Sequence, residues 1–525
     1  MSSDATAPRR IAVALDGPGT PRWQERALER LRAEPGLEVA EVRLAGTRRR
    51  GIARRLHEAV ERRLFALGPE ALDPVAVERV AVDPSAPPGG REQPSLLVWL
   101  AESTPAPRDA GPVLELCHDG RAEPAEEAFR RAVLRGAPTV ATEAVLRDGE
   151  RVVTLRRTVS GARPYSSTLS RDKALWKIAA MAARAAATAG GEAGRTNPAA
   201  TAEGLAGSPH PGTASGRAPS DAELLLRSPW RWLRVVAARL AFERPWQIRV
   251  RERASDPVAG WSAAPERPVV RWADRHLYAD PMLFEHEGHH HLFCEDLAPG
   301  SNRAVISHVA LAPGSAGGSP RPVLQAPHHL SYPYVFAHGG EVFMIPESSA
   351  ERRVELYRAE RFPDEWTLDA VLLDGVIASD ATLLEHEGRL WLFACVTEPG
   401  ATLLDELHLF WAERLAGPWH PHPLNPVVSD VACARPAGAV QVWGGRLVRP
   451  AQDCSRRYGG AVSFREIDVL SESEYAEHEI ARIDPAVAGR RTRAVHTYAA
   501  DRLYEAIDLR SRRLRARRPA VWSGP

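Results

Sequence analysis

The sequence predicts two domains, an N-terminal α/β domain of the Rossmann type and a C-terminal, all-β, five-bladed propeller. Strands alternate with helices in the first half of the chain, whereas a strand-turn-strand unit recurs at intervals of roughly 50 residues in the second. A stretch rich in Ala, Gly, Thr, Ser and Pro separates the halves. We place the α/β domain at 9–185, a flexible linker at 186–220, a connecting helix at 221–244 and the propeller at 245–515.

The α/β domain opens with an apolar run at 11–15, a turn rich in Gly and Pro, and a helix expected at 21–32. Further elements follow in the same alternating order: strands at 95–100 and 113–116, a helix at 123–135 and a strand pair at 139–156. A mostly parallel sheet covered by helices accommodates this order.

The connecting helix is amphipathic. Its apolar side chains near one face are Trp230, Leu233, Val236 and Leu240, and its arginines elsewhere are Arg231, Arg234 and Arg239. The helix is expected to pack on a neighbouring domain, and the alternative is contact with a membrane surface.

The repeat is the strongest pattern in the chain. Residues 279–288, 331–340 and 379–388 align without a gap, and each segment ends at a glycine that precedes a second apolar strand. A fourth copy at 434–448 needs one inserted residue, and a weaker fifth spans 495–504. A lone blade cannot bury both its faces and must pack on neighbours, so five hairpins predict five blades.

Equivalent positions of the innermost strands should converge at one mouth of the central channel. These positions hold Asp280, Tyr332, Asp380 and Arg435, and His496 is the candidate from the fifth blade. Because each hairpin is antiparallel, the second strand returns to the same level. It brings the remaining candidates: Glu295, Asp296, Glu347, Gln452, Asp453 and Arg456.

The ring therefore combines acids with arginine and amide partners. For Asp296 and Asp453, an equally good interpretation is that they cap strand ends or hold blades together. For Asp280 and Asp380 we favour function, because converging charge is costly to bury without a use.

Composition excludes several other classes. The net charge of +1 provides no basic field for nucleic acid. The five cysteines form no CxxC pair, which argues against a zinc site or a disulfide framework and favours a reducing cytoplasm. Consecutive strand residues point to opposite faces, so we do not expect the run 289–291 of histidines to form a metal site. We expect neither a metal nor another cofactor.

The propeller resembles a known group. The strings ADPMLFEHEG, LSYPYVF, SDATLLEHEG, ARPAG and RPAQDCSRRYG, between about 280 and 500, are similar to glycoside hydrolase family 43. They look closer still to the N-terminal propeller of plant glucosamine inositolphosphorylceramide transferases and their bacterial relatives. The family 43 resemblance implies that Asp280 is the general base and that Asp380 orients and tunes this base.

Arg435 stands where that family has its general acid, a glutamate. Arginine does not donate a proton at neutral pH, so two-carboxylate hydrolysis would need Glu347 or Glu295 instead. An arginine facing two aspartates suits an anionic or phosphorylated sugar, or an ion-paired wall.

The first domain resembles formyltransferases in its IAVALDG start, its helix at 21–32 and its segment at 113–118. His118 matches that family's histidine, but Leu116 stands where an asparagine is expected. The downstream aspartate loop is reduced to 147–149. The resemblance implies a degenerate relative kept for binding or scaffolding.

Two main functions follow from these patterns. The first is a carbohydrate-active enzyme of glycan or glycolipid metabolism, with a sugar or glycoside, anionic or nucleotide-linked, in the propeller mouth. The second is a non-catalytic glycan-binding module. A sugar N-formyltransferase would be a third, and it needs an asparagine near His118 in the fold.

Overall fold

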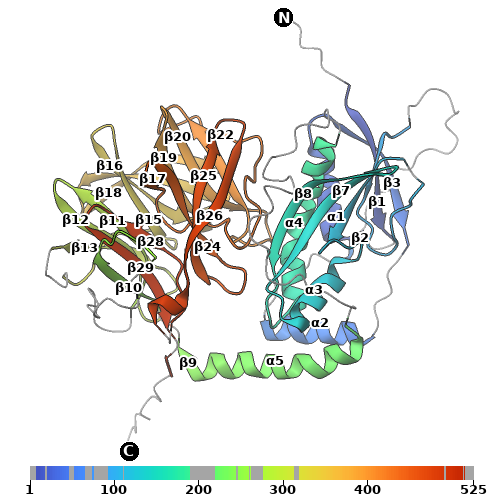
Figure 1. Cartoon of the computed structure of the whole chain (residues 1–525), viewed down its shortest axis with the longest axis horizontal. Coiled ribbons are helices and arrows are strands. Elements are labelled where there is room, and N and C mark those ends of the chain that lie inside the picture. Colours follow the sequence, from blue (N-terminus) through green and yellow to red (C-terminus); the bar gives the residue numbers. More distant parts are fainter. Residues whose placement is uncertain are drawn as a thin grey trace, which may run out of the picture.

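A computed structural model shows two bodies side by side, with one long helix running beneath them (Figure 1). It describes residues 7–17, 20–46, 52–65, 74–75, 93–109, 111–189, 219–243, 246–258, 261, 276–312, 318–489, 492–511 and 513–514. Residues 190–218, most of the predicted linker, lie outside this set.

The N-terminal domain is built on one mixed sheet. Its strands lie in the order β3 (Leu37–Ala45), β1 (Arg9–Asp16), β5 (Leu96–Trp99), β6 (Val113–His118), β7 (Thr139–Asp148) and β8 (Arg151–Gly161). The first four are parallel, and β7 and β8 join them antiparallel. A short pair, β2 (Thr20–Pro21) and β4 (Pro74–Val75), lies apart. The expected α/β fold is confirmed.

Helices supply the rest of this domain. They are α1 (Arg22–Ala33), α2 (Ile52–Phe65), α3 (Ala125–Arg135), α4 (Ser167–Thr188) and α5 (Asp221–Ala241). Trp23, Phe129 and Leu175, from α1, α3 and α4, are buried in one apolar core with Val13 and Val98 of the sheet. Within the described residues, no helix is long and apolar enough to cross a membrane.

The C-terminal region forms five four-stranded sheets among the described residues, which confirms the predicted five-bladed propeller. Blade one contains β11 (Leu277–His286), β12 (His289–Leu297), β13 (Val305–Leu311) and β14 (Arg321–Leu324). Blade two contains β15 (Ser331–His338), β16 (Glu341–Ser348), β17 (Arg353–Arg361) and β18 (Glu365–Asp374). Blade three contains β19 (Ile377–His386), β20 (Arg389–Thr397), β21 (Leu407–Ala412) and β22 (His420–Pro421).

Blades four and five hold the weaker repeats. Blade four contains β23 (Gln441–Trp443), β24 (Arg446–Asp453), β25 (Ala461–Leu470) and β26 (Tyr475–Ile483). Blade five contains β10 (Trp246–Glu252), β27 (Thr492–Ala494), β28 (Tyr498–Ala500) and β29 (Tyr504–Ser511). Because β10 pairs antiparallel with β29, the start of the propeller closes onto its end. Next to this closure, β9 (Phe242–Glu243) just before β10 pairs with β30 (Arg513–Leu514) just after β29.

The two domains are joined by direct contacts. Lys177 of α4 donates to Asp405 at 2.7 Å, and both side chains are buried. The backbone N–H of Val159 on β8 donates to the carbonyl of Ser429 at 2.9 Å. The N-terminal domain therefore contacts the segment between β20 and β21 and the start of blade four, at the channel end where Asp380 lies.

Candidate functional site

The innermost strands of blades one to three share an unusual backbone conformation. Asp280, Tyr332 and Asp380 adopt φ values of 50°, 45° and 54°, in the left-handed region. In blade one the strand register shifts between Ala279 and Met282, and equivalent shifts occur in blades two and three. Such bulges redirect a side chain and are common beside functional sites. The repeat thus aims three buried side chains inward.

One half of the ring is a chain of two aspartates with a histidine between them. His496 Nε2 lies 3.3 Å from Asp280 Oδ1, and its Nδ1 lies 2.5 Å from Asp508 Oδ2. The Thr497 hydroxyl donates to Asp280 Oδ1 at 2.8 Å. Asp508 also accepts from the backbone N–H groups of Asp280 and Thr497, at 3.0 and 2.9 Å. Asp508 therefore holds the His496 ring next to the backbone of β11 at Asp280.

Burial and these charges set the protonation of the chain. Burial raises the pKa of Asp280 to about 6, although the charge of His496 opposes the change. Burial lowers the pKa of His496, but Asp508 and Asp280 outweigh it and raise that pKa to about 9. At neutral pH, His496 is therefore a cation and Asp280 titrates close to the working range.

The other half of the ring is centred on Arg435. Its Nε and Nη2 donate to the two oxygens of Asp380, at 2.5 and 3.0 Å, and Nη2 also reaches Glu347 at 3.3 Å. Nη1 donates to the Leu403 carbonyl at 2.9 Å, and the Gln452 amide adds a donor to Asp380 at 2.9 Å. Asp380 receives three N–H donors, an arrangement that fits an ionised carboxylate. The Arg435 charge is thus neutralised within the protein.

The ring of Tyr458 links the two halves, and a second aromatic ring supports the histidine. His496 stacks on Trp246 with ring centroids 4.1 Å apart, and Tyr458 lies 5.1 Å from His496. The guanidinium of Arg435 lies 5.2 Å from the centre of the Tyr458 ring. Tyr458 also packs against an apolar cluster that includes Val159 of the N-terminal domain. The site therefore borders the contact between the domains, a frequent location for ligand sites.

The partly exposed members of the site are acidic. The side chain of Glu347 is 11% exposed and that of Glu295 is 13% exposed. Glu295 lies 3.4 Å from the Nε2 of His329, and its hydrogen bond raises the pKa of that histidine. The deeper groups, Asp280 and Asp380, are almost fully buried.

Two predicted residues have their contacts elsewhere, and a third is exposed. Asp296 contacts His276 at 2.6 Å and Ser307 at 2.8 Å, because it follows Glu295 in a strand and points to the opposite face. Asp453 contacts Arg482 of its own blade at 2.7 Å. Arg456 is exposed. For Asp296 and Asp453 these contacts match the alternative of holding a blade together.

Four residues of the site were not predicted: Trp246, Tyr458, Thr497 and Asp508. Trp246 is on β10, which completes blade five from the far end of the propeller sequence. Asp508 is on β29, in the copy where the repeat is weakest. The one available signal was the string around Tyr458, which lies within the resemblance to known propellers.

The ligand-type atoms of Asp280, His496 and Asp508 all lie within 4.8 Å of one another, so their metal-binding capacity is relevant. However, both His496 nitrogens already face carboxylates, and Asp508 is bonded by backbone N–H groups. A metal ion would require a deprotonated histidine and the loss of these bonds. The donor set therefore fits a protonated histidine better than a metal.

The N-terminal domain contains a separate cavity of about 310 Å³. Its lining consists of residues 99–106 and 122–124 with Glu115, Leu116 and His118. His118 is fully buried, its Nδ1 lies 2.9 Å from the Thr142 hydroxyl, and burial lowers its pKa to about 4. His118 is thus neutral, and Leu116 lines the same cavity.

Comparison with known proteins gives a match over the propeller. Residues 247–503 match the family described as "Glucosamine inositolphosphorylceramide transferase 1, N-terminal". The rice (Oryza sativa subsp. japonica) protein of that name is 33% identical over 241 residues, which is 45% of this chain and 32% of the rice protein. The Arabidopsis thaliana protein is 34% identical over 206 residues, 38% of this chain and 27% of that protein.

The chain therefore covers about a third of the length of the curated relatives it matches. Among solved structures, an exo-beta-1,3-galactanase from Phanerochaete chrysosporium with galactose is similar at 13% identity and a TM-score of 0.32. That similarity covers 39% of this chain and 49% of the galactanase. The family match confirms the predicted resemblance of the propeller to glucosamine inositolphosphorylceramide transferases. The formyltransferase resemblance of the first domain stays a prediction.

Proposed function

Because its propeller matches this transferase family, we propose that the protein is a carbohydrate-active enzyme of glycolipid metabolism. The sugar of its substrate would lie at the propeller mouth, against Glu347, Glu295 and Tyr458. Carboxylates and an aromatic ring are suited to binding sugar hydroxyl groups and the apolar face of a sugar.

The observation that carries the proposal is the chain from Asp508 through His496 to Asp280. With a pKa of about 6, Asp280 is roughly nine-tenths ionised at pH 7 and is well placed to accept a proton. The buried His496 cation and the Thr497 hydroxyl hold its carboxylate in position. We assign Asp280 the role of general base toward water or a sugar hydroxyl.

The charge around Arg435 shapes the choice of ligand. Asp380 and Glu347 already neutralise this guanidinium. Arg435 therefore forms an ion-paired part of the site wall and is not available to bind a phosphate. The acids at the mouth then favour a neutral or amine-bearing sugar over a strongly anionic one. A nucleotide-linked ligand would have to be held outside this ring.

A non-catalytic glycan-binding module is the second candidate. Arg435 stands at the position expected for a general acid, and the other expected carboxylate, Asp380, is paired with it. A site without a proton donor would recognise a sugar but would not hydrolyse its glycosidic bond.

The test is a calorimetric binding screen of the full chain against glycans and glycolipid headgroups, followed by turnover assays on those that bind. Asp280→Asn should leave binding within a few-fold and abolish turnover, and wild-type turnover should rise with pH around 6. Asp453→Asn is the matched control, because that carboxylate contacts Arg482 instead.

Binding without turnover in the wild type would favour the glycan-binding module. Glu347→Gln changes a carboxylate proposed to contact the sugar and should weaken binding. If binding is unchanged in Glu347→Gln, the sugar does not lie at the propeller mouth and the proposal fails.

A further inference from the structure

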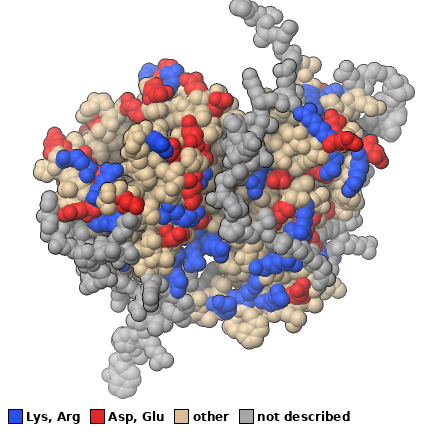
Figure 2. Space-filling view, viewed as in Figure 1, with Lys and Arg blue, Asp and Glu red and all other residues tan. Residues whose placement is uncertain are grey.

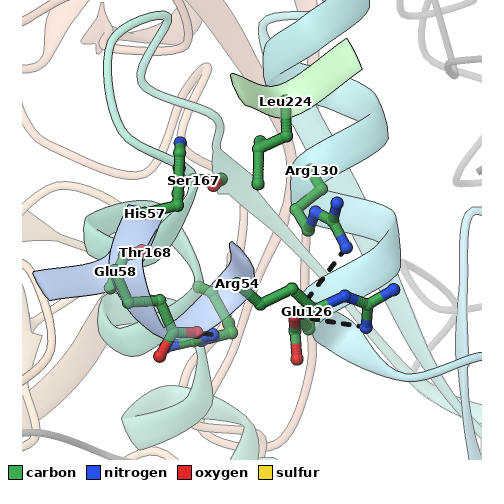
Figure 3. A pocket seen from close by; sticks show the side chains of 9 residues that line it. Arg54, His57, Glu58, Glu126, Arg130, Ser167, Thr168 and Leu224 are labelled. Atoms are coloured by element: carbon green, nitrogen blue, oxygen red, sulfur yellow. Dashed lines mark hydrogen bonds and ion pairs between the residues drawn. The ribbon is translucent and has the colours of Figure 1, made fainter. Parts of the chain in front are cut away.

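The inner face of α5 is firmly attached to the N-terminal domain. Leu224 and Ser228 are buried, and Ser228 Oγ lies 2.9 Å from His57 Nε2 of α2. Arg231 donates to the Leu134 carbonyl at 2.6 Å, and the Trp232 indole donates to the Tyr165 carbonyl at 3.1 Å. Figure 3 shows Leu224 reaching from α5 toward a small polar cavity. The expected packing on a neighbouring domain is therefore seen in these contacts.

The outer face of the same helix is apolar and exposed. Leu226, Trp230 and Leu233 are 73%, 70% and 57% exposed, and their spacing of four and three residues places them on one stripe. Trp230 and Leu233 were expected on the packing face, but the inward positions are taken by Leu224, Ser228 and Arg231. A helix that already packs through one face thus presents a second, uncovered apolar stripe.

The charges beside the stripe are of one sign. From Leu224 to the end of α5 the sequence contains four arginines and no acidic residue, and Arg227 and Arg234 are exposed. The two acids at the helix start are engaged: Asp221 pairs with Arg54 at 3.0 Å, and Glu223 accepts from a backbone N–H.

The neighbouring helix α2 has the same character. Its Ile52 and Leu56 are 86% and 58% exposed, and Arg55 and Arg63 are exposed as well. Its glutamates, Glu58 and Glu61, are buried. Figure 2 shows blue side chains gathered along the lower edge of the molecule, where Figure 1 places α5 and α2.

We propose that the outer stripe of α5, defined by Leu226, Trp230 and Leu233, docks on the surface of an anionic lipid bilayer. A helix with an exposed apolar stripe and flanking arginines lies in the interface, with its apolar side chains among the acyl chains and its arginines at the lipid phosphates. Tryptophan is favoured at that depth. The inference rests on α5 and α2, not on the propeller site.

A second copy of this chain fits the stripe less well. A two-fold contact would bring the same surface of both copies together and would place Arg227 and Arg234 near their counterparts. Like charges at such a contact oppose association, whereas lipid phosphates neutralise them. Charge complementarity therefore selects the anionic bilayer.

The test is co-sedimentation of the full chain with vesicles of phosphatidylglycerol and phosphatidylcholine, and with vesicles of phosphatidylcholine alone. The wild type should bind the anionic vesicles, bind the neutral ones at least tenfold more weakly, and lose binding as salt rises. The double variant Leu226→Glu, Trp230→Glu should lower binding at least tenfold. Val442→Glu, which changes a 65% exposed side chain on the propeller, is the matched control and should bind as wild type.

The charge is tested separately. Arg227→Gln with Arg234→Gln should weaken binding to anionic vesicles and leave the circular dichroism and melting temperature unchanged, because both side chains are exposed. The proposal is overturned if the wild type ignores anionic vesicles at low salt, or if the double glutamate variant still binds them. It is also overturned if sedimentation shows a wild-type dimer that the glutamate variant dissociates, since the stripe would then be a contact between copies.

Discussion

Arg435 of blade four donates to Asp380 of the neighbouring blade three, with Nε 2.5 Å from Oδ2. Both side chains are buried, so neither charge has water to replace its partner. The left-handed backbone at Asp380 and the irregular start of blade four bring the two together. The propeller mouth is thus organised by an ion pair between blades, beside a second one formed by His496.

Removing the cation should destabilise the whole propeller. Arg435→Met leaves Asp380 and Glu347 without their common partner, and breaking a buried pair in this way lowers the free energy of unfolding by about 3 to 5 kcal/mol. Urea denaturation measures the loss. Arg456→Met, which changes an exposed arginine of the same blade, should stay within about 0.5 kcal/mol of wild type. Equal losses in the two variants would contradict the role of the pair.

The His496 cation makes stability depend on alkaline pH. A histidine whose pKa rises from 6.5 unfolded to about 9 folded contributes stability that is complete below pH 6.5. This contribution, about 3 kcal/mol, is lost as pH rises through 9. The free energy of unfolding should therefore fall between pH 7 and 10, as measured by urea denaturation at each pH.

Two variants isolate this effect. His496→Gln should remove most of the fall, whereas His478→Gln, which changes a half-exposed histidine paired with Asp468, should keep it. A wild-type protein whose stability is constant from pH 7 to 10 would show that His496 is not a buried cation.

The sequence predicted the parts of the site that the repeat encodes. Asp280, Tyr332 and Asp380 occupy one repeated position, and the same alignment reached Arg435 and His496 despite its insertion. Alignment could not show that Asp508, on the weakest copy, would be the partner of His496. It also left open whether Asp296 serves the channel or holds its blade together, because residue spacing alone does not decide which of two neighbouring strand residues points inward.

The closure of the ring and the contact between the domains could not be predicted from the sequence, because both depend on residues far apart in the chain. Trp246 reaches His496 only because β10 pairs with β29, across about half of the chain. The contact of Lys177 with Asp405 joins residues 228 positions apart that no repeat relates. Such long-range pairings follow from tertiary packing, which local patterns do not encode.

Gly438 should tolerate no side chain. It adopts φ 139°, and a Cβ there would lie 1.9 Å from the carbonyl oxygen of Tyr498 in blade five. Its N–H also donates to the Tyr332 hydroxyl at 2.8 Å. Gly438→Ala should lower the free energy of unfolding by about 3 kcal/mol or more, because backbone must move. Gly318→Ala is the control, since no atom lies within 4 Å of its Cβ, and a similar loss there would contradict the steric explanation.

The ion pair between Lys177 and Asp405 should couple the unfolding of the two domains. Lys177 lies among Asp405 and Glu406, and both carboxylates are almost fully buried at the contact with α4. Burial raises the pKa of Glu406 to about 7, although Arg184 and Lys177 oppose the change. Lys177→Met keeps the length of the side chain but leaves Asp405 without its cation, at a cost of about 3 kcal/mol.

In Lys177→Met the two domains should then unfold in separate thermal transitions. The lost stabilisation belongs to the contact between the domains and not to either core. Differential scanning calorimetry should show one transition for wild type and two for Lys177→Met. Lys173→Met, one turn earlier on α4, removes only a hydrogen bond to the Gly400 carbonyl and should cost about 1 kcal/mol while keeping one transition. If the two variants melt alike, the buried pair contributes no more to domain coupling than that hydrogen bond does.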